Sequence, residues 1–188
     1  ADELTNRDAA WRVELRNKMK PKERTAIERC PMPELEPAYR ATKLREEVNT
    51  GFTKEMALVE AQRCLDCPKP ACMEGCPVSI NIPSFVKNIE RGEFIKAAQV
   101  LKMTSSLPAV CGRVCPQEKQ CESKCIHLKM GHKAVAIGGL ERFAADYARE
   151  SGEMPAPQVA ASNGKKIAVV GSGPAGLSFA GDMAKLGY

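Results

Sequence analysis

Aromatic residues are scarce in this sequence. Phenylalanine, tyrosine and tryptophan together make up 5% of its 188 residues, and there is a single tryptophan. A core with so little aromatic bulk suggests that something besides apolar packing helps to hold the chain together. Long apolar runs are absent as well, and the short run Ile167 to Val170 is far below the ~20 residues that a membrane helix needs. We therefore expect a protein without a membrane span.

The charge is mixed and only slightly basic. The sequence has 28 lysines and arginines against 23 aspartates and glutamates, a net charge of +5, and no block of five or more basic residues. A solvated, mildly basic surface explains this balance, so we expect no nucleic-acid partner. Residues 1–8 are charged and contain no apolar segment typical of a secretory signal. We expect a cytoplasmic protein whose thiols stay reduced.

Apolar residues at helical spacing predict a mainly α fold for residues 1–150. Thr53 stands where a helix N-cap is expected, because its hydroxyl can accept a hydrogen bond from the first turn of a helix. The predicted helices are Asp8 to Met19, Thr53 to Leu65, Pro83 to Met103 with a break near Gly92, and Ala134 to Arg149.

The character of the sequence changes after residue 150. Residues 151–165 contain Pro, Ser and Gly and lack a burial pattern, so we expect a linker. Residues 166–188 begin with a β-branched run, which predicts a short strand, and continue with glycines and a stretch at helical spacing. We interpret this last segment as the truncated first β-α unit of a Rossmann-like dinucleotide-binding domain.

The glycines of this unit, Gly171, Gly173 and Gly176, have the spacing Gly-x-Gly-x-x-Gly and are candidate cofactor-binding residues. In the dinucleotide fingerprint the first permits a tight turn, the second admits the pyrophosphate, and the third lets helix and strand pack closely. The acidic residue expected ~20 positions further on, for the ribose, would lie beyond Tyr188. Since one strand and one helix cannot bury a dinucleotide, we expect residues 166–188 alone to bind little or none.

Nine cysteines are the most informative feature, and eight of them fall into two groups of similar spacing. Disulfides are disfavoured, since nothing in the sequence directs the chain to an oxidising compartment. Two metal-binding interpretations remain, zinc and iron-sulfur clusters. The two groups are Cys64-x2-Cys67-x4-Cys72-x3-Cys76 and Cys111-x3-Cys115-x4-Cys121-x3-Cys125.

A zinc site would need four ligands in two short-spaced pairs. Cys64-x2-Cys67 and His127-x4-His132 offer such pairs, but about 60 residues separate them, where a zinc finger has ~12–15. We therefore interpret the two histidines as surface residues. A zinc-stapled, non-catalytic interaction domain remains as an alternative.

Iron-sulfur ligation explains more of the cysteine spacing. In bacterial two-cluster ferredoxins, three closely spaced thiolates bind one cluster, and a fourth that precedes a proline binds the other. The middle gap here is four residues instead of two, so the match is one of pattern. The same exchange of ligands between groups gives one set of Cys64, Cys67, Cys72 and Cys125, and a second set of Cys76, Cys115 and Cys121. The second set needs one more ligand, which stays open at this point, with Cys111 as a candidate because its sulfur is a soft donor.

Four motifs carry a resemblance to a known family: Arg63-Cys64-Leu65-Asp66-Cys67, Gly75-Cys76-Pro77-Val78, Gly112-Arg113-Val114-Cys115-Pro116 and Ile137-Gly138-Gly139-Leu140-Glu141-Arg142. Together they resemble the N-terminal domain of the small (β) subunit of NADPH-dependent glutamate synthase. A similar domain occurs in the FAD-bearing large subunit of NADH-dependent ferredoxin-NADP oxidoreductase and in dihydropyrimidine dehydrogenase. The resemblance runs from about Thr53 to Tyr188.

This resemblance implies an α-helical ferredoxin domain with two 4Fe-4S clusters and crossed ligation. In the family, one cluster takes four thiolates, and the other takes three thiolates and an oxygen from a glutamate or glutamine. The residue that corresponds to the oxygen ligand is Glu141, which leaves Cys111 as a neighbour of the cluster. The glycine-rich turn at Gly171, Gly173 and Gly176 is expected to bind FAD in the full-length parent protein.

The function that the resemblance implies is electron transfer. NADPH reduces FAD in the parent protein, and electrons pass through the two clusters to the large (α) subunit of glutamate synthase, or a similar flavoprotein, for glutamate synthesis. We expect no turnover from this chain alone and no catalytic residue in it. A homodimer is possible, with the helix faces around Phe85 to Leu101 as candidates unless they pack in the core. The large subunit of NADH-dependent ferredoxin-NADP oxidoreductase is the alternative parent.

Overall fold

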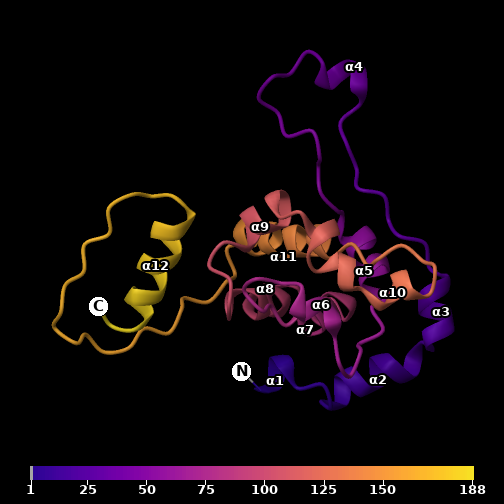
Figure 1. The fold of residues 1–188 in the computed structure, drawn as a ribbon, viewed down its shortest axis with the longest axis horizontal. Helices are drawn as coiled ribbons and strands as arrows, with labels where there is room; N and C mark the ends of the chain where they lie inside the picture. The colour runs from indigo at the N-terminus through magenta and orange to yellow at the C-terminus, as the bar shows by residue number, and fades with distance from the viewer. Residues whose placement is uncertain (1) are drawn as a thin grey trace.

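The structure, a computed structural model that describes residues 2–188, is built almost wholly from helices (Figure 1). Within this described range no strand forms, and Glu34 and Asn49 make an isolated antiparallel bridge. The predicted mainly α fold is confirmed. The helices are α1 (Asp2–Thr5), α2 (Ala10–Lys18), α3 (Pro21–Ala26), α4 (Pro37–Arg40), α5 (Lys54–Gln62), α6 (Ala71–Glu74), α7 (Ile82–Glu90), α8 (Phe94–Lys102), α9 (Pro108–Val114), α10 (Ile126–Lys129), α11 (Ile137–Ser151) and α12 (Pro174–Lys185), with 3-10 turns η1 (Gln117–Lys119) and η2 (Glu122–Lys124).

Helix α7 forms the centre of the core. It packs against α5, α8 and α11, and every residue from Ile82 to Ile89 is buried. Asn81 caps it by accepting a hydrogen bond from the Ser84 backbone N–H, and Gly92, at φ +82°, makes the turn into α8. The predicted helix pair with its break near Gly92 is therefore confirmed.

Helices α5 and α11 also follow the sequence prediction. The Thr53 hydroxyl accepts a hydrogen bond from the Met56 backbone N–H at 3.3 Å, as expected of an N-cap. Helix α11 lies across α8 and α9 and ends where Gly152 takes a left-handed conformation. Phe85 and Leu101 are both fully buried, so the expectation that these two residues pack in the core is confirmed.

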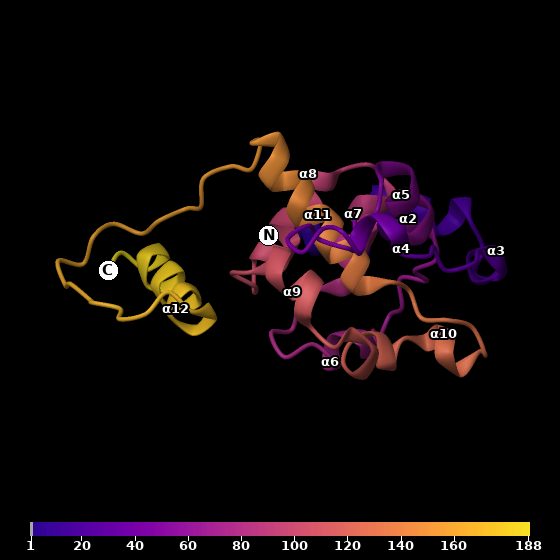
Figure 2. The same ribbon diagram turned by 90° about the horizontal axis from the view of Figure 1, so that it is seen from above.

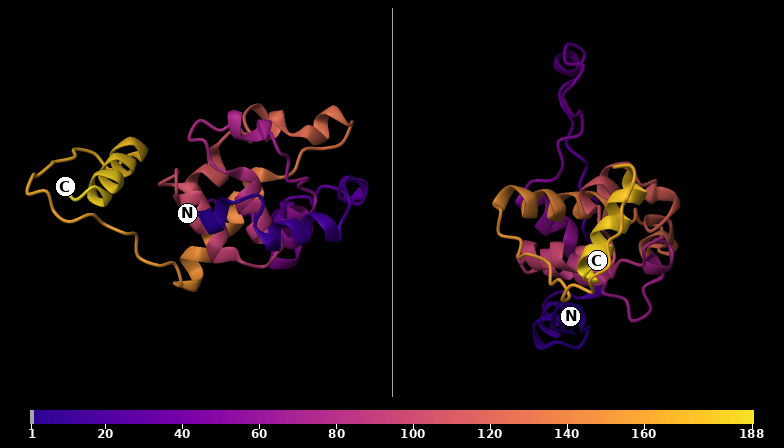
Figure 3. Two further views of the ribbon diagram at one scale, coloured as in Figure 1. Left: turned by 90° about the horizontal axis from the view of Figure 1, so that it is seen from below. Right: turned by 90° about the vertical axis from the view of Figure 1, so that its left-hand side faces the viewer.

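The first three helices run along one side of this core (Figures 1 and 3). Helices α2 and α3 are fixed by buried arginines rather than by apolar stripes. Arg24, at 2% exposure, donates hydrogen bonds to the Leu15 and Gln62 carbonyls and pairs with Glu90 at 2.9 Å. Such pairing is required because a buried guanidinium without partners would be strongly unfavourable.

Residues 33–50 form an arm that projects from the body and carries α4 (Figures 1 and 3). Two backbone hydrogen bonds join its sides, from Leu35 N–H to the Val48 carbonyl and from Thr50 N–H to the Pro33 carbonyl. At its base, Arg142 of α11 donates hydrogen bonds to the backbone and side-chain oxygens of Asn49. The arm is thus attached to the core through α11.

The predicted strand over Ile167 to Val170 is wrong for this chain. These residues are exposed and form no strand, whereas the predicted helix after the glycines is present as α12, at the end of an extended connection (Figure 2). A strand needs a neighbour to satisfy its backbone groups, and the residues that the structure describes supply none. Across the same residues, no helix is long and apolar enough to cross a membrane.

Candidate metal centre

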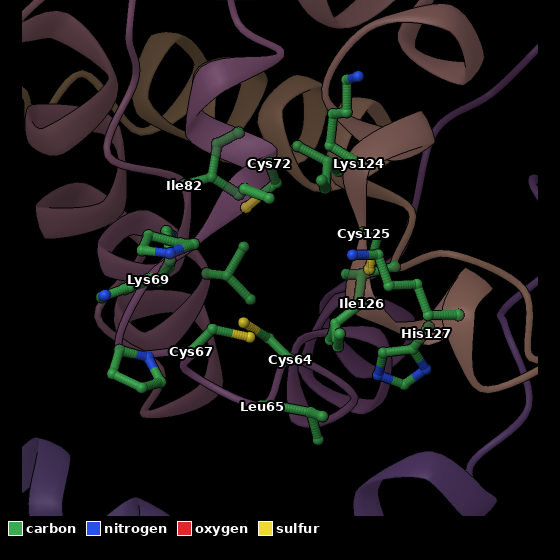
Figure 4. Close-up of a pocket in the computed structure, with 18 residues that line it drawn as sticks. Cys64, Leu65, Cys67, Lys69, Cys72, Ile82, Lys124, Cys125, Ile126 and His127 are labelled. Atoms are coloured by element: carbon green, nitrogen blue, oxygen red, sulfur yellow. The ribbon is translucent and has the colours of Figure 1, made fainter.

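Four thiols from separate parts of the chain line one cavity of about 440 Å³. Helix α5 ends just before Cys64, α6 carries Cys72, and Cys125 precedes α10. Figure 4 shows the side chains of Cys64, Cys67, Cys72 and Cys125 around this cavity, between the α6 and α10 segments. The first predicted ligand set is therefore brought together in space.

The loop between Cys64 and Cys67 is held by buried charges. Asp66 has a left-handed backbone, φ +52°, and a side chain with no exposed surface. Its carboxylate accepts hydrogen bonds from Arg12 and from Arg16, each as short as 2.6 Å. On the other side, the ammonium group of Lys87 donates to the Cys64 carbonyl at 2.6 Å.

Burial raises the pKa of Asp66, but hydrogen bonds from Arg12 and Arg16 and the charges of Arg12 and Lys87 outweigh it, and the net shift is downward. The carboxylate thus stays ionised within its arginine partners. Charge pairing from the N-terminal helices therefore fixes the loop that carries two of the cysteines.

The second predicted set is assembled by close backbone contacts at two glycines. A Cβ on Gly75 would lie 2.6 Å from the Gln120 carbonyl oxygen, so only glycine lets the Cys76 segment approach the segment of Cys121. A Cβ on Gly112 would lie 2.6 Å from the Arg142 backbone nitrogen, so α9 and α11 touch beside Glu141. These contacts bring Cys76, Cys115, Cys121 and Glu141 into one neighbourhood, as their mutual electrostatic interactions indicate.

The thiols are half-buried or buried, which disfavours their ionised form. Burial raises the pKa of Cys64 to about 11. Burial is the largest cause of the raised pKa of Cys72, and the neighbouring thiols of Cys64 and Cys125 add to it. Burial likewise raises the pKa of Cys115 to about 11 and that of Cys121 to about 12. A bound cation would offset this cost, because metal-bound cysteines are thiolates.

Glu141 has the burial and the free acceptor atom that a metal ligand needs. The residue is 6% exposed, and its Oε1 atom is buried without a hydrogen-bond partner. Burial raises its pKa to about 7. Such a carboxyl is costly unless something nearby satisfies it, so the donor set of three thiols and one carboxylate fits a metal group.

Cys111 lies next to this set. Its thiol interacts with the Cys115 thiol and lies 4.0 Å from the Ser105 hydroxyl. Its backbone carbonyl accepts a hydrogen bond from the Gln117 side chain. Cys30 is remote from both sets, and its thiol donates to the Met56 carbonyl at 3.7 Å.

The interpretation of His127 as a surface residue is wrong, whereas His132 is exposed as expected. The His127 ring is fully buried beside the first cavity, and its Nε2 atom lies 2.9 Å from the Arg63 carbonyl oxygen. Burial lowers its pKa. Arg63 itself is buried and donates to the Ala134 and Lys133 carbonyls. No periodic signal marks either residue, because their partners are distant in the sequence.

Within residues 2–188, no three histidine, cysteine, aspartate or glutamate side chains are arranged to hold one metal ion. The thiols of the first set surround a volume instead of converging on a point. A 4Fe-4S cluster needs its thiolates placed around a volume, since each thiolate binds a different iron of the cluster.

The glycine-rich turn precedes α12. Gly171 has φ +101°, Gly173 is the N-cap, and Pro174 begins the helix. Gly176 lies against the Gly171 carbonyl, where a side chain would clash. The turn therefore has glycines where the fingerprint needs them.

Comparison with known proteins agrees with this geometry. Residues 40–153 match the family described as dihydropyrimidine dehydrogenase domain II, 4Fe-4S cluster. The chain is similar to the glutamate synthase (NADPH) small chains of Escherichia coli K12 (38% identical, 81% of this chain and 33% of the relative) and Azospirillum brasilense (36%, 84% and 33%). It is also similar to the NAD-dependent dihydropyrimidine dehydrogenase subunit PreT of Escherichia coli K12 (35%, 76% and 34%). The chain spans about a third of the length of these relatives.

Proposed function

Because the chain belongs to the 4Fe-4S family described as dihydropyrimidine dehydrogenase domain II, we propose that it is an electron-transfer domain of an oxidoreductase and that residues 1–150 hold two such clusters. Residues 151–165 are the linker, and residues 166–188 begin the flavin-binding domain of a longer protein. When bound, the clusters accept and release single electrons. The observation that carries the proposal is the cavity lined by thiols from two distant chain segments, together with the Oε1 atom of Glu141, which is buried without a hydrogen-bond partner among the described residues.

The first cluster takes its ligands from both cysteine groups. The α5–α6 segment supplies three thiolates, and the segment before α10 supplies the fourth. The arginine-bound Asp66 sets the conformation of the ligand loop, and the apolar wall keeps water from the sulfurs. The proposed ligands are Cys64, Cys67, Cys72 and Cys125.

The second cluster has a mixed ligand set. Helix α11 supplies a carboxylate oxygen, which is a harder donor than a thiolate and favours the more oxidised iron. The two clusters therefore have different reduction potentials. The proposed ligands are Cys76, Cys115, Cys121 and Glu141.

In the full-length protein, NADPH supplies electrons through FAD, and the clusters pass them to the large subunit of glutamate synthase or a similar flavoprotein. Similarity to the small chains of glutamate synthase supports this parent. The glycine-rich turn of Gly171, Gly173 and Gly176 supports an FAD site completed by further chain. The cluster domain lies between the flavin and the partner, and its own residues bind and insulate the clusters.

Anaerobic purification of the chain tests the cluster proposal. We expect a brown protein with about eight iron atoms and about eight sulfides per chain, whose visible absorbance fades on reduction by dithionite. A colourless protein that contains stoichiometric zinc would instead support the zinc-stapled alternative.

An activity assay of the full-length parent protein tests which enzyme it belongs to. With the large subunit of glutamate synthase present, we expect oxidation of NADPH coupled to formation of glutamate. Reduction of ferredoxin from NADH would favour the ferredoxin-NADP oxidoreductase alternative.

A further inference from the structure

The rim of the first cavity is basic. Three lysines line it, Lys69, Lys124 and Lys129, and all three are exposed. The residues that line this cavity include no aspartate or glutamate. Throughout the described part of the chain, none of these lysines makes an ion pair or a side-chain hydrogen bond. Figure 4 shows the amino groups of Lys69 and Lys124 turned away from the cavity, on different sides of it.

Four arginines of the molecule are used differently. Arg12, Arg24 and Arg63 are buried and pair with carboxylates inside the fold. Arg113 bridges Glu47 and Asp146 across the arm and α11. The three lysines at the cavity therefore contribute positive charge to the surface that no neighbouring carboxylate neutralises.

Apolar side chains lie among these lysines. On α10, Ile126 is 36% exposed and Leu128 is 46% exposed, and Met130 follows at 43%. Leu65 and Pro68 line the cavity beside the cysteines. An apolar centre with a charged rim is typical of protein interfaces, and small interfaces suit short-lived electron-transfer encounters.

We propose that this surface, the lysine rim (Lys69, Lys124 and Lys129), docks a redox protein that presents a carboxylate-rich face. The inference rests on the proposed function, since it places the exchange of electrons at the first cluster. Opposite charge steers the two proteins together and orients them so that the thiol-lined cavity faces the partner's redox centre. Salt weakens such steering, because it screens exposed charges.

The test uses the anaerobically purified, cluster-loaded chain, reduced and freed of excess dithionite. The probe is oxidised plant plastocyanin, an acidic copper protein, mixed with the chain in a stopped-flow instrument. One electron leaves a reduced cluster and converts Cu(II) to Cu(I), so loss of the blue colour reports the second-order rate. Cytochrome c, a basic acceptor reduced from Fe(III) to Fe(II), is the matched probe of opposite charge.

The variant K69Q/K124Q/K129Q removes the lysine rim. The control K18Q/K22Q/K166Q makes the same change in net charge at exposed lysines that do not line the cavity. At low salt we expect the rim variant to reduce plastocyanin about tenfold more slowly than the wild type, and the control to stay within about twofold. The difference should vanish at high salt, and cytochrome c should react no more slowly with the rim variant.

Equal rates for the two triple variants would overturn the proposal, because net charge rather than the rim would then govern the encounter. Tight binding of duplex DNA that is lost in the rim variant would overturn it too, by making the rim a site for nucleic acid. Iron content and the visible spectrum of each variant are measured first. A wild-type chain without iron-sulfur clusters would contradict the proposed function itself, which is a separate outcome.

Discussion

Glu141 is the residue on which the proposed second site depends. It lies on a buried helix, beside thiols of two other segments, and one of its oxygen atoms has no partner in the described structure. Cys111 is the competing ligand by chemistry, but its thiol interacts with Cys115 and lies near Ser105. A ligand and a neighbour respond differently to substitution, so the two roles can be separated by experiment.

Substitution of Glu141 by alanine is expected to lower the iron content from about eight to about four atoms per chain, or to convert the second cluster to a form with a changed EPR spectrum. Glu141→Gln, which keeps an oxygen donor, should retain both clusters. Cys111→Ser should leave the iron content unchanged. The reverse pattern, with iron lost from Cys111→Ser alone, would make Cys111 the eighth ligand.

Asp66 provides the second prediction at this scale. Asp66→Asn leaves the guanidinium of Arg12, 2% exposed, without its carboxylate, and breaking a buried pair typically costs about 3–5 kcal/mol. The free energy of unfolding, measured with urea under anaerobic conditions, should fall accordingly. Asp8→Asn is the matched control, because the 82% exposed Asp8 side chain pairs with Arg16 at 3.7 Å and should contribute at most about 1 kcal/mol. Similar losses for the two variants would refute a role for the buried pair.

At the scale of elements, contact between α9 and α11 joins the second cysteine group to Glu141. The contact requires Gly112, where a Cβ would meet the Arg142 backbone. Gly112→Ala should push the helices apart, lower the free energy of unfolding by about 1–3 kcal/mol and selectively impair the second cluster in iron and EPR measurements.

Gly181→Ala is the matched control, since Gly181 lies within α12 with open space around its Cα. It should leave both clusters unchanged and stabilise the helix by about 0.5–1 kcal/mol at most. If Gly112→Ala also leaves both clusters and the stability unchanged, the close approach of α9 and α11 does not form the site.

The elements that sequence reasoning predicted best are those with local causes. Helix α5 has its N-cap within one turn, and the α7–α8 turn is set by one glycine. The pairing of Arg12 with Asp66 and the burial of His127 depend on residues more than fifty positions away, so periodicity does not indicate them. The choice of Glu141 over Cys111 came from resemblance to a family, because residue chemistry alone favoured the thiol.

At the scale of the whole molecule, the chain combines a helical body, in which we propose the two clusters, with one further helix, α12, which we propose belongs to a second unit. The predicted strand at residues 167–170 does not form here, and its failure has a tertiary cause: a parallel strand needs neighbours that the described residues lack. The glycine-rich turn alone offers backbone N–H groups but no walls for an adenine or an isoalloxazine ring.

FAD should therefore bind weakly or not at all to this chain. Titration followed by flavin fluorescence, after removal of unbound FAD by gel filtration, is expected to show no stoichiometric complex. A longer form of the protein that completes the parallel sheet should bind FAD and provides the positive control. Tight one-to-one binding to residues 1–188 would contradict the interpretation of residues 166–188 as an incomplete unit.

The central claim is that each cysteine group lends one ligand to the cluster of the other. Anomalous diffraction at the iron edge from crystals of the anaerobically purified chain tests it most directly. We predict two separate four-iron sites, with Cys125 bound beside Cys64, Cys67 and Cys72, and Cys76 bound beside Cys115, Cys121 and Glu141. A single site, or Cys76 on the same cluster as Cys64, would contradict it.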